Sequence, residues 1–251
     1  MEKIPVWSEK RTVRFSAVDK SNTMTLDAVM NYFQEAAVNH AENLGVGHEA
    51  LAEIHQGWVL SRMSVQIDRR PKCDENITVR TWPRGSEKML AIRDFDIIGA
   101  DEIPVIRARS GWIIIDTEKR RPLRPQTVTE KLPSNEGLDA MSAVTGLAEH
   151  QFPLDSLKRT AAYTDLDYNG HVNNVSYVKW IEDTMDPVLL EKAEHMRLDI
   201  KYTSEVLPGE VTEIRSVPID PSDSSPSRAF AFEGRKQRDN QPVFRAELRL
   251  R

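Results

Sequence analysis

The chain has 251 residues, a formal net charge of −5 and a sequence pI near 5.8, so whole-molecule attraction to nucleic acid is not expected. The single cysteine, Cys73, excludes an internal disulfide. No apolar run approaches the ~20 residues that a membrane-spanning helix needs, and the first ten residues lack the apolar core of a secretory signal. We therefore expect a cytoplasmic protein that binds neither nucleic acid nor membrane.

A long helix is predicted over residues 26–44. Apolar side chains recur there at spacings of three and four and therefore share one face: Leu26, Met30, Phe33, Ala37, Ala41 and Leu44. Gly45 can end this helix. His40 lies near its end and has no second ligand at metal spacing, so we interpret it as a structural histidine.

A run of strands follows this helix. The predicted strands cover residues 59–67, 77–82, 89–98 and 103–116. In the first of them, alternate residues are assigned to one buried face: Val59, Ser61, Met63, Val65 and Ile67. No helical pattern separates the strands, which argues against a parallel sheet and favours an antiparallel one. One helix followed by antiparallel strands is an α+β pattern.

The second half of the chain repeats this order. A short strand, a turn, a helix and four strands occur twice, and Asp167 stands before the second helix as Asp19 stands before the first. A charged, proline-rich stretch separates the two halves. We predict an N-terminal unit at residues 1–130, a crossover at 131–158 and a C-terminal unit at 159–251.

Polar residues that can act on a carbonyl group lie just before the second helix. Asp167, Asn169 and His171 alternate there. The helix itself is predicted from an apolar face made by Val175, Val178, Ile181 and Met185. A helix N-terminus favours developing negative charge, because its first N–H groups lack partners. A carboxylate, an amide and an imidazole in this position can therefore assist attack on a carbonyl. Asp and Asn also form ordinary turns, but a turn does not require the imidazole of His171.

The stretch from Asp167 to Asn174, Asp-Tyr-Asn-Gly-His-Val-Asn-Asn, resembles the active-site motif of the acyl-acyl carrier protein thioesterases of plants and bacteria. Tyr177 and Trp180, which follow it, fit the same motif. The helix at 26–44 also resembles that family's first helix, so the resemblance extends over most of the chain. It implies a tandem (double) hotdog fold of the α+β class, in which each repeat is a long helix wrapped by an antiparallel sheet.

The resemblance implies a thioester hydrolase of fatty acid biosynthesis without metal or organic cofactor. The catalytic residues that it implies are Asp167, Asn169, His171 and Glu205. It also implies that the carbonyl is polarised by the Asn169 amide and by backbone N–H groups from His171 to Asn173, which makes Asn173 a substrate-binding residue. Glu205 and His171 then activate water, and the sequence leaves open which of them is the general base.

Two departures from the motif restrict this interpretation. Family members often carry a cysteine after the catalytic glutamate, where this chain has Val206, so we expect no thiol nucleophile and interpret Cys73 as incidental. When the two repeats are overlaid, Ser21, Thr23 and Arg70 occupy the places of the second unit's amide, imidazole and carboxylate. One catalytic site per chain follows.

The resemblance also implies that the N-terminal unit holds the fatty acyl chain in an apolar tunnel. The candidate lining residues are Met30, Phe33, Val59 and Met63. The same side chains can equally be ordinary core, because methionine and phenylalanine at helical spacing commonly pack inside a protein.

Acyl carrier protein, the expected partner, is acidic and would dock on basic groups. Two groups are candidates, although each also fits a solvated run of charge: Arg69, Arg70 and Lys72, and then Lys119, Arg120, Arg121 and Arg124. The sequence leaves open whether the chain forms a homodimer.

Three other functions would suit the same fold. A hotdog hydratase carries its histidine five residues after the aspartate with an intervening proline, whereas His171 lies four residues after Asp167 with no proline between them. An acyl-CoA thioesterase of the same fold stays open. A non-catalytic acyl-binding or sensor protein also stays open, but it has no need of His171 or Glu205.

Overall fold

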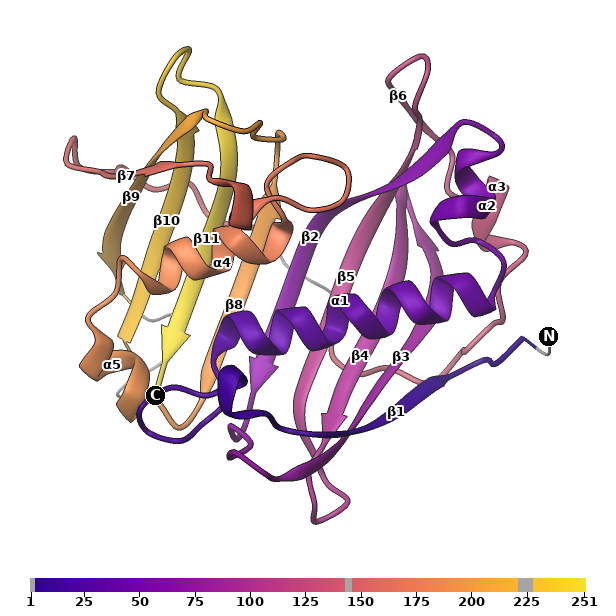
Figure 1. Cartoon of the computed structure of the whole chain (residues 1–251), viewed down its shortest axis with the longest axis horizontal. Coiled ribbons are helices and arrows are strands. Elements are labelled where there is room, and N and C mark those ends of the chain that lie inside the picture. The colour runs from indigo at the N-terminus through magenta and orange to yellow at the C-terminus, as the bar shows by residue number, and fades with distance from the viewer. Residues whose placement is uncertain (1–2, 143–145, 221–227) are drawn as a thin grey trace.

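The computed structural model describes residues 3–142, 146–220 and 228–251 (Figure 1). Its strands are β1 (Trp7–Thr12), β2 (Gln56–Ile67), β3 (Asn76–Glu87), β4 (Leu90–Ile98), β5 (Pro104–Asp116), β6 (Arg121–Leu123), β7 (Leu157–Thr160), β8 (Met196–Tyr202), β9 (Val211–Ile219), β10 (Arg228–Lys236) and β11 (Pro242–Leu250). Its α-helices are α1 (Leu26–Asn43), α2 (His48–Ala52), α3 (Gln126–Thr129), α4 (Asn174–Glu182) and α5 (Pro187–Lys192). In the part of the chain that is described, no helix is both long and apolar enough to cross a membrane.

The strands of both halves form one antiparallel sheet in the order β1-β3-β4-β5-β2-β8-β11-β10-β9-β7, with β6 added on β5. Read inward from each end, the two units have the same strand order, β1-β3-β4-β5-β2 and β7-β9-β10-β11-β8. The units are therefore related by an approximate two-fold axis at the central β2–β8 pair. Met63 pairs with Ile200 and Val65 with Leu198 in that pair. The two units therefore share a continuous sheet and an apolar core, as expected for a tandem hotdog fold.

The α1 and α4 helices lie on the same side of the sheet, and α1 crosses the strands of the N-terminal unit (Figure 1). Thr25 caps α1 by accepting the N–H of Ala28 at 3.4 Å. On the buried face, the Phe33 ring packs 4.9 Å from the Phe95 ring of β4. Complete burial of a side chain of this kind is worth about 1.5–3 kcal/mol. The predicted amphipathic helix is confirmed.

Each unit has the same loop ahead of its helix. In the N-terminal unit the N–H of Asp19 donates to the carbonyl of Thr23 at 3.0 Å, and in the C-terminal unit the N–H of Asp167 donates to the carbonyl of His171 at 2.8 Å. The sequence overlay that aligned these two aspartates is therefore confirmed by the backbone hydrogen bonds.

The overlay also holds where the strand after each helix ends. The carbonyl oxygen of the residue that follows Arg70 accepts the N–H of Met24 at 2.8 Å. The carbonyl oxygen of the residue that follows Glu205 accepts the N–H of Val172 at 2.9 Å. Arg70 and Glu205 thus occupy equivalent places in the two units.

The second helix is shorter than its counterpart. α4 has 9 residues and α1 has 18. Pro187 opens α5 and Asp186 caps it by accepting the N–H of Val188 at 2.9 Å. A residue before proline is disfavoured in the α conformation, so the chain cannot continue α4 through Asp186. Met185 consequently lies beyond α4, and the prediction that it belongs to the helix is wrong.

A bulge in β2 corrects the predicted face of Val59. Leu60 pairs with Trp112 and Arg62 pairs with Gly111, so Ser61 is an extra residue that shifts the alternation. Val59 therefore points to the face opposite Met63 and is 41% exposed. Its assignment to the buried face, and with it to an apolar tunnel, is wrong.

Glu182 joins the two units through their helices. It is the last residue of α4, and its carboxylate accepts the N–H groups of Leu26 at 3.0 Å and Asp27 at 3.2 Å, at the first turn of α1. Burial, together with the nearby charge of Asp27, raises the pKa of Glu182 to about 8, although the two backbone hydrogen bonds act to lower it. The carboxyl group is thus a buried titratable contact between the units.

The pKa of Glu182 predicts how stability depends on pH. Because its folded-state pKa exceeds the ordinary value, the folded protein binds a proton that the unfolded chain releases. The stabilising contribution is complete below the ordinary pKa and is lost as pH rises toward about 8. Glu182→Gln should therefore lose less stability than wild type between pH 5 and pH 8, measured by urea unfolding at each pH. Parallel pH dependences of the two proteins would contradict this assignment.

Candidate active site

Asp167 organises the loop that precedes α4. One carboxylate oxygen accepts the N–H of Asn169 at 2.9 Å and lies 3.4 Å from the N–H of His171. The other lies 3.4 Å from the Asn169 amide nitrogen. Gly170 completes the turn with a φ of +78°, a conformation that glycine adopts without a steric penalty. Asp167 therefore fixes the loop and orients the Asn169 amide.

His171 faces Glu205, the other residue that the family resemblance implied for the activation of water. The Nε2 atom of His171 lies 3.4 Å from Oε2 of Glu205, and the side chains are 36% and 41% exposed. The structure thus brings together an imidazole and a carboxylate from two segments that are separated in the sequence. Both side chains have access to solvent, from which a water molecule can be recruited.

The N-terminal unit contributes a third group to this pair. Arg120, in the turn between β5 and β6, donates from Nη2 to Oε1 of Glu205 at 2.9 Å. One oxygen of Glu205 therefore faces Arg120 while the other faces His171. Sequence reasoning identified Arg120 only as a docking candidate, because its contact with Glu205 arises from the pairing of β2 with β8.

A second contact across the two units involves the loop that precedes α4. The hydroxyl of Tyr168 lies 2.6 Å from Nδ1 of His48, the first residue of α2, and the two rings meet edge to face at 4.5 Å. Sequence reasoning missed this pair entirely. No local pattern around His48 indicates a partner 120 residues away.

The backbone N–H groups that the sequence analysis assigned to the carbonyl are already engaged. Val172 donates to the carbonyl of Val206 at 2.9 Å, and Asn173 donates to the carbonyl of Asp165 at 2.8 Å. The N–H of His171 faces the Asp167 carboxylate. The expectation that N–H groups from residues 171 to 173 polarise the substrate is therefore wrong, because the loop uses them to hold its own shape.

The available donor lies one residue further along the chain. The Asn173 side chain caps α4 by accepting the N–H of Val175 at 3.0 Å. Among the described residues, the N–H of Asn174 has no hydrogen-bond partner, although it is the first N–H of the helix. The N–H of Asn174 is therefore the free donor at the positive end of α4 among the described residues, and Asn173 fixes the start of this helix as its cap.

The corresponding place in the N-terminal unit is closed by an ion pair. Arg70 Nη1 lies 2.9 Å from Asp19, and its Nη2 donates to the carbonyl of Glu191 at 3.0 Å. Burial alone raises the pKa of Asp19, but hydrogen bonds from Ser21 and Arg70 lower it below its ordinary value. Thr23 stands where the C-terminal unit has His171. This copy of the loop has neither the imidazole nor the carboxylate that face each other in the C-terminal unit.

Three of the predicted tunnel residues are buried in the core of the N-terminal unit. Met30, Phe33 and Met63 are each less than 5% exposed. Cys73, by contrast, is half-buried in the turn that follows β2, and it lies in the other unit from His171 and Glu205.

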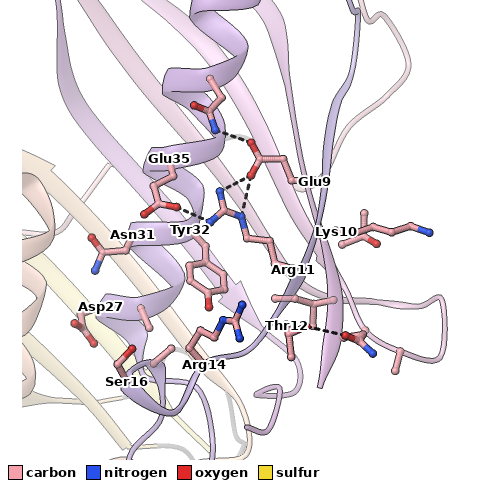
Figure 2. Close-up of a pocket in the computed structure, with 18 of the residues that line it drawn as sticks. Glu9, Lys10, Arg11, Thr12, Arg14, Ser16, Asp27, Asn31, Tyr32 and Glu35 are labelled. Carbon is pink, nitrogen blue, oxygen red and sulfur yellow. Dashed lines mark hydrogen bonds and ion pairs between the residues drawn. The ribbon is translucent and has the colours of Figure 1, made fainter. Parts of the chain in front are cut away.

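The groove of Figure 2 has a volume of about 1220 Å³ and lies between β1 and α1. Its lining is polar: Arg11 bonds to Glu9 and Glu35, and its guanidinium stands 5.7 Å from the centre of the Tyr32 ring. The residues of the loop that precedes α4 are not among those that line it. A lining of paired charges does not fit an acyl chain.

Comparisons with known proteins cover nearly the whole chain. Residues 5–132 match the family described as the acyl-ACP thioesterase N-terminal domain, and residues 155–244 match the acyl-ACP thioesterase C-terminal domain. A chloroplastic acyl-[acyl-carrier-protein] hydrolase of Cuphea viscosissima is 29% identical over 245 residues, covering 86% of this chain and 56% of the relative. A chloroplastic oleoyl-acyl carrier protein thioesterase of Coriandrum sativum is 26% identical over 251 residues, covering 91% and 67%. The chain thus spans about half to two thirds of the length of these relatives.

Solved structures share the fold over the full length. The 12:0-ACP thioesterase from Umbellularia californica has a TM-score of 0.84 at 22% identity, covering 98% of this chain and 94% of that one. An acyl-ACP thioesterase from Bacteroides thetaiotaomicron has a TM-score of 0.81 at 24% identity, covering 97% of both chains. These likenesses establish the tandem arrangement of the two units.

The two equivalent positions should respond differently to loss of charge. Arg70→Met should destabilise the fold by about 3 kcal/mol, because it leaves the largely buried Asp19 carboxylate without its cation. Glu205→Gln should change stability by less than about 1 kcal/mol, because the Glu205 side chain is substantially exposed and its ion pairs are screened by solvent. Urea unfolding of both variants measures the difference. Equal destabilisation would mean that Glu205 is also a structural residue.

Proposed function

Because the chain belongs to the acyl-ACP thioesterase family, we propose that it hydrolyses acyl-acyl carrier protein thioesters to a free fatty acid and the carrier thiol. The observation that carries the proposal is the facing pair of His171 and Glu205, 3.4 Å apart, with His171 in the same loop as Asn169. A protein that only binds acyl chains has no use for an imidazole and a carboxylate aimed at each other in a solvent-accessible position.

The reaction requires a water molecule between the catalytic pair and the thioester carbonyl. Glu205 or His171 removes a proton from this water, and the water oxygen forms a bond to the carbonyl carbon. The resulting tetrahedral intermediate expels the carrier thiolate, which takes up the proton. General-base assistance of this kind contributes about 10²–10⁴-fold in rate.

Negative charge develops on the carbonyl oxygen in this step. The N–H of Asn174 and the positive end of α4 stabilise that charge, together with the Asn169 amide that Asp167 orients. Asn173 acts here through its cap, which fixes the start of the helix. The mechanism assigns no role to a thiol, because Val206 occupies the position next to Glu205 and is fully buried.

We propose that the acyl chain lies against the N-terminal unit and displaces side chains of its core near Met30, Phe33 and Met63. Each methylene group that leaves water contributes about 0.8 kcal/mol, which is enough to favour such an opening for a long chain. Val59 takes no part, since it points to the other face of the sheet.

For docking of the acidic carrier, the contacts favour one of the two basic groups. Arg69 is bound to Glu75 through both of its terminal nitrogens, at 2.9 and 2.7 Å, and Arg70 is buried against Asp19. These charges are already neutralised. The turn that carries Arg120 lies against Glu205, and three further exposed cations belong to the same segment of the chain: Lys119, Arg121 and Arg124.

The activity itself is tested by measuring the thiol released from acyl-carrier and from acyl-CoA substrates. Asn169→Ala and His171→Ala should each lower turnover by at least about 10²-fold, because these groups act on the reacting carbonyl and water. Circular dichroism and unfolding controls establish that the variants fold. Near-normal turnover in both variants would contradict the assignment, and faster hydrolysis of acyl-CoA would favour an acyl-CoA thioesterase of the same fold.

The docking surface is tested by reversing charge in matched groups. Changing Lys119, Arg121 and Arg124 to glutamate should raise KM for acyl-carrier and weaken the salt dependence of kcat/KM, because long-range attraction to the acidic partner is lost. The same change at Arg69 and Lys72 serves as the control and should have a smaller effect. An unchanged KM in the first group would show that the carrier docks elsewhere.

A further inference from the structure

The two units differ in what occupies the first turn of their helices. In the N-terminal unit, the carboxylate of Glu182 accepts the N–H groups of Leu26 and Asp27. In the C-terminal unit, the corresponding first N–H, that of Asn174, has no partner among the described residues. The fold thus contains one helix N-terminus that holds an internal anion and one that is open.

The approximate two-fold relation of the units identifies the residue that faces the open terminus. Leu26 and Asn174 each begin a helix directly after a capping residue. Counted from these starts, Glu182 in α4 corresponds to Gln34 in α1. If Glu182 reaches the first turn of α1, then Gln34, whose side chain has the same length, stands in reach of the first turn of α4.

Gln34 has an environment that fits this position. It is half-buried on α1, and its amide makes no hydrogen bond with any described residue. Gln34 lines a small hollow with Glu35, Val38 and Asn39 of the same helix, whereas Asn31 lines the polar groove of Figure 2, to which Glu35 also belongs. Gln34, Val38 and Glu42 are spaced four residues apart and so lie on one side of α1. Glu42 accepts the N–H of His48 at 2.8 Å, and His48 contacts Tyr168 of the loop that precedes α4. The side of α1 that carries Gln34 therefore continues toward the candidate site.

We infer that Gln34 is a further catalytic residue, whose amide donates to the thioester carbonyl oxygen together with the N–H of Asn174. This inference rests on the proposed function. According to this inference, the developing oxyanion binds at the N-terminus of α4 in the place that corresponds to the Glu182 carboxylate at the N-terminus of α1. The N-terminal unit then supplies a group that contacts the substrate at the reacting carbonyl.

The replacement of a carboxylate by an amide is what allows catalysis at one helix only. A glutamate at position 34 would bond to the Asn174 N–H itself and would repel the oxyanion. Glutamine is neutral and carries two N–H donors, so it leaves the backbone donor available and adds one of its own. Glu182 and Gln34 have side chains of equal length, but Glu182 caps α1, whereas Gln34 donates to the oxyanion at α4.

Two substitutions at this position separate a catalytic role from a structural one. Gln34→Ala should lower kcat on acyl-carrier by about 10²-fold, as expected for the loss of one oxyanion donor. Gln34→Glu should lower kcat at least as much, although it preserves side-chain shape and is an equally good helix former. Its rate relative to wild type should rise as pH falls, because protonation of the introduced carboxyl group removes the repulsion.

The controls use the same chemical changes elsewhere. Glu182→Gln is the reverse exchange at the equivalent position, and Asn31→Asp adds a charge to the same helix within the polar groove; both should keep wild-type kcat. If the wild-type chain releases thiol but both Gln34 variants match its kcat, the inference is wrong. If the wild-type chain hydrolyses neither acyl-carrier nor acyl-CoA, the proposed function fails instead, so the two failures are distinguishable.

Discussion

The antiparallel pairing of β2 with β8 is the contact on which the rest of the molecule depends. Six residue pairs join these strands, from Arg62 and Lys201 to Ile67 and Met196. At their centre the buried hydroxyl of Ser64 donates to the carboxylate of Asp199. This pairing turns two separate sheets into one and fixes the two helices beside each other. It also brings Arg120 of the N-terminal unit to Glu205, and His48 to Tyr168.

Two nearly identical frameworks therefore differ in chemistry through a few side chains. The loops before α1 and α4 share their backbone hydrogen bonds, and both aspartates bind the backbone and side chains of their own loop. In the N-terminal unit Arg70 neutralises Asp19, whereas in the C-terminal unit Glu205 faces His171. The shared backbone places the residue that follows the central strand of each unit next to the loop. That residue is Arg70 in one unit, where it forms a structural ion pair, and Glu205 in the other, where it faces an imidazole.

Spacing patterns within short stretches of the sequence were enough to predict the helix α1, the strands and the internal repeat. The apolar spacing in α1, the antiparallel strands and the repeat aligned on Asp19 and Asp167 are all confirmed, and His171 does meet Glu205. The bulge at Ser61 was not predictable, because the residues around it keep an alternating pattern while the strand changes register.

The contacts between the two units could not be predicted from the sequence either. Arg120 and Glu205 are 85 residues apart, and Tyr168 and His48 are 120 apart, with no periodicity to connect them. The engaged N–H groups of Val172 and Asn173 were missed for a related reason. Their acceptors depend on how a distant strand end and a preceding turn pack against the loop, and the sequence motif shows neither.

The buried pair of Asp19 and Arg70 constrains how this protein can evolve. Replacing Arg70 alone leaves a carboxylate without its cation, and replacing Asp19 alone leaves a guanidinium that is 7% exposed without its anion. Either single replacement costs stability, and neither by itself produces an imidazole that faces a carboxylate. Converting the N-terminal unit to the arrangement of the C-terminal unit therefore requires several substitutions together.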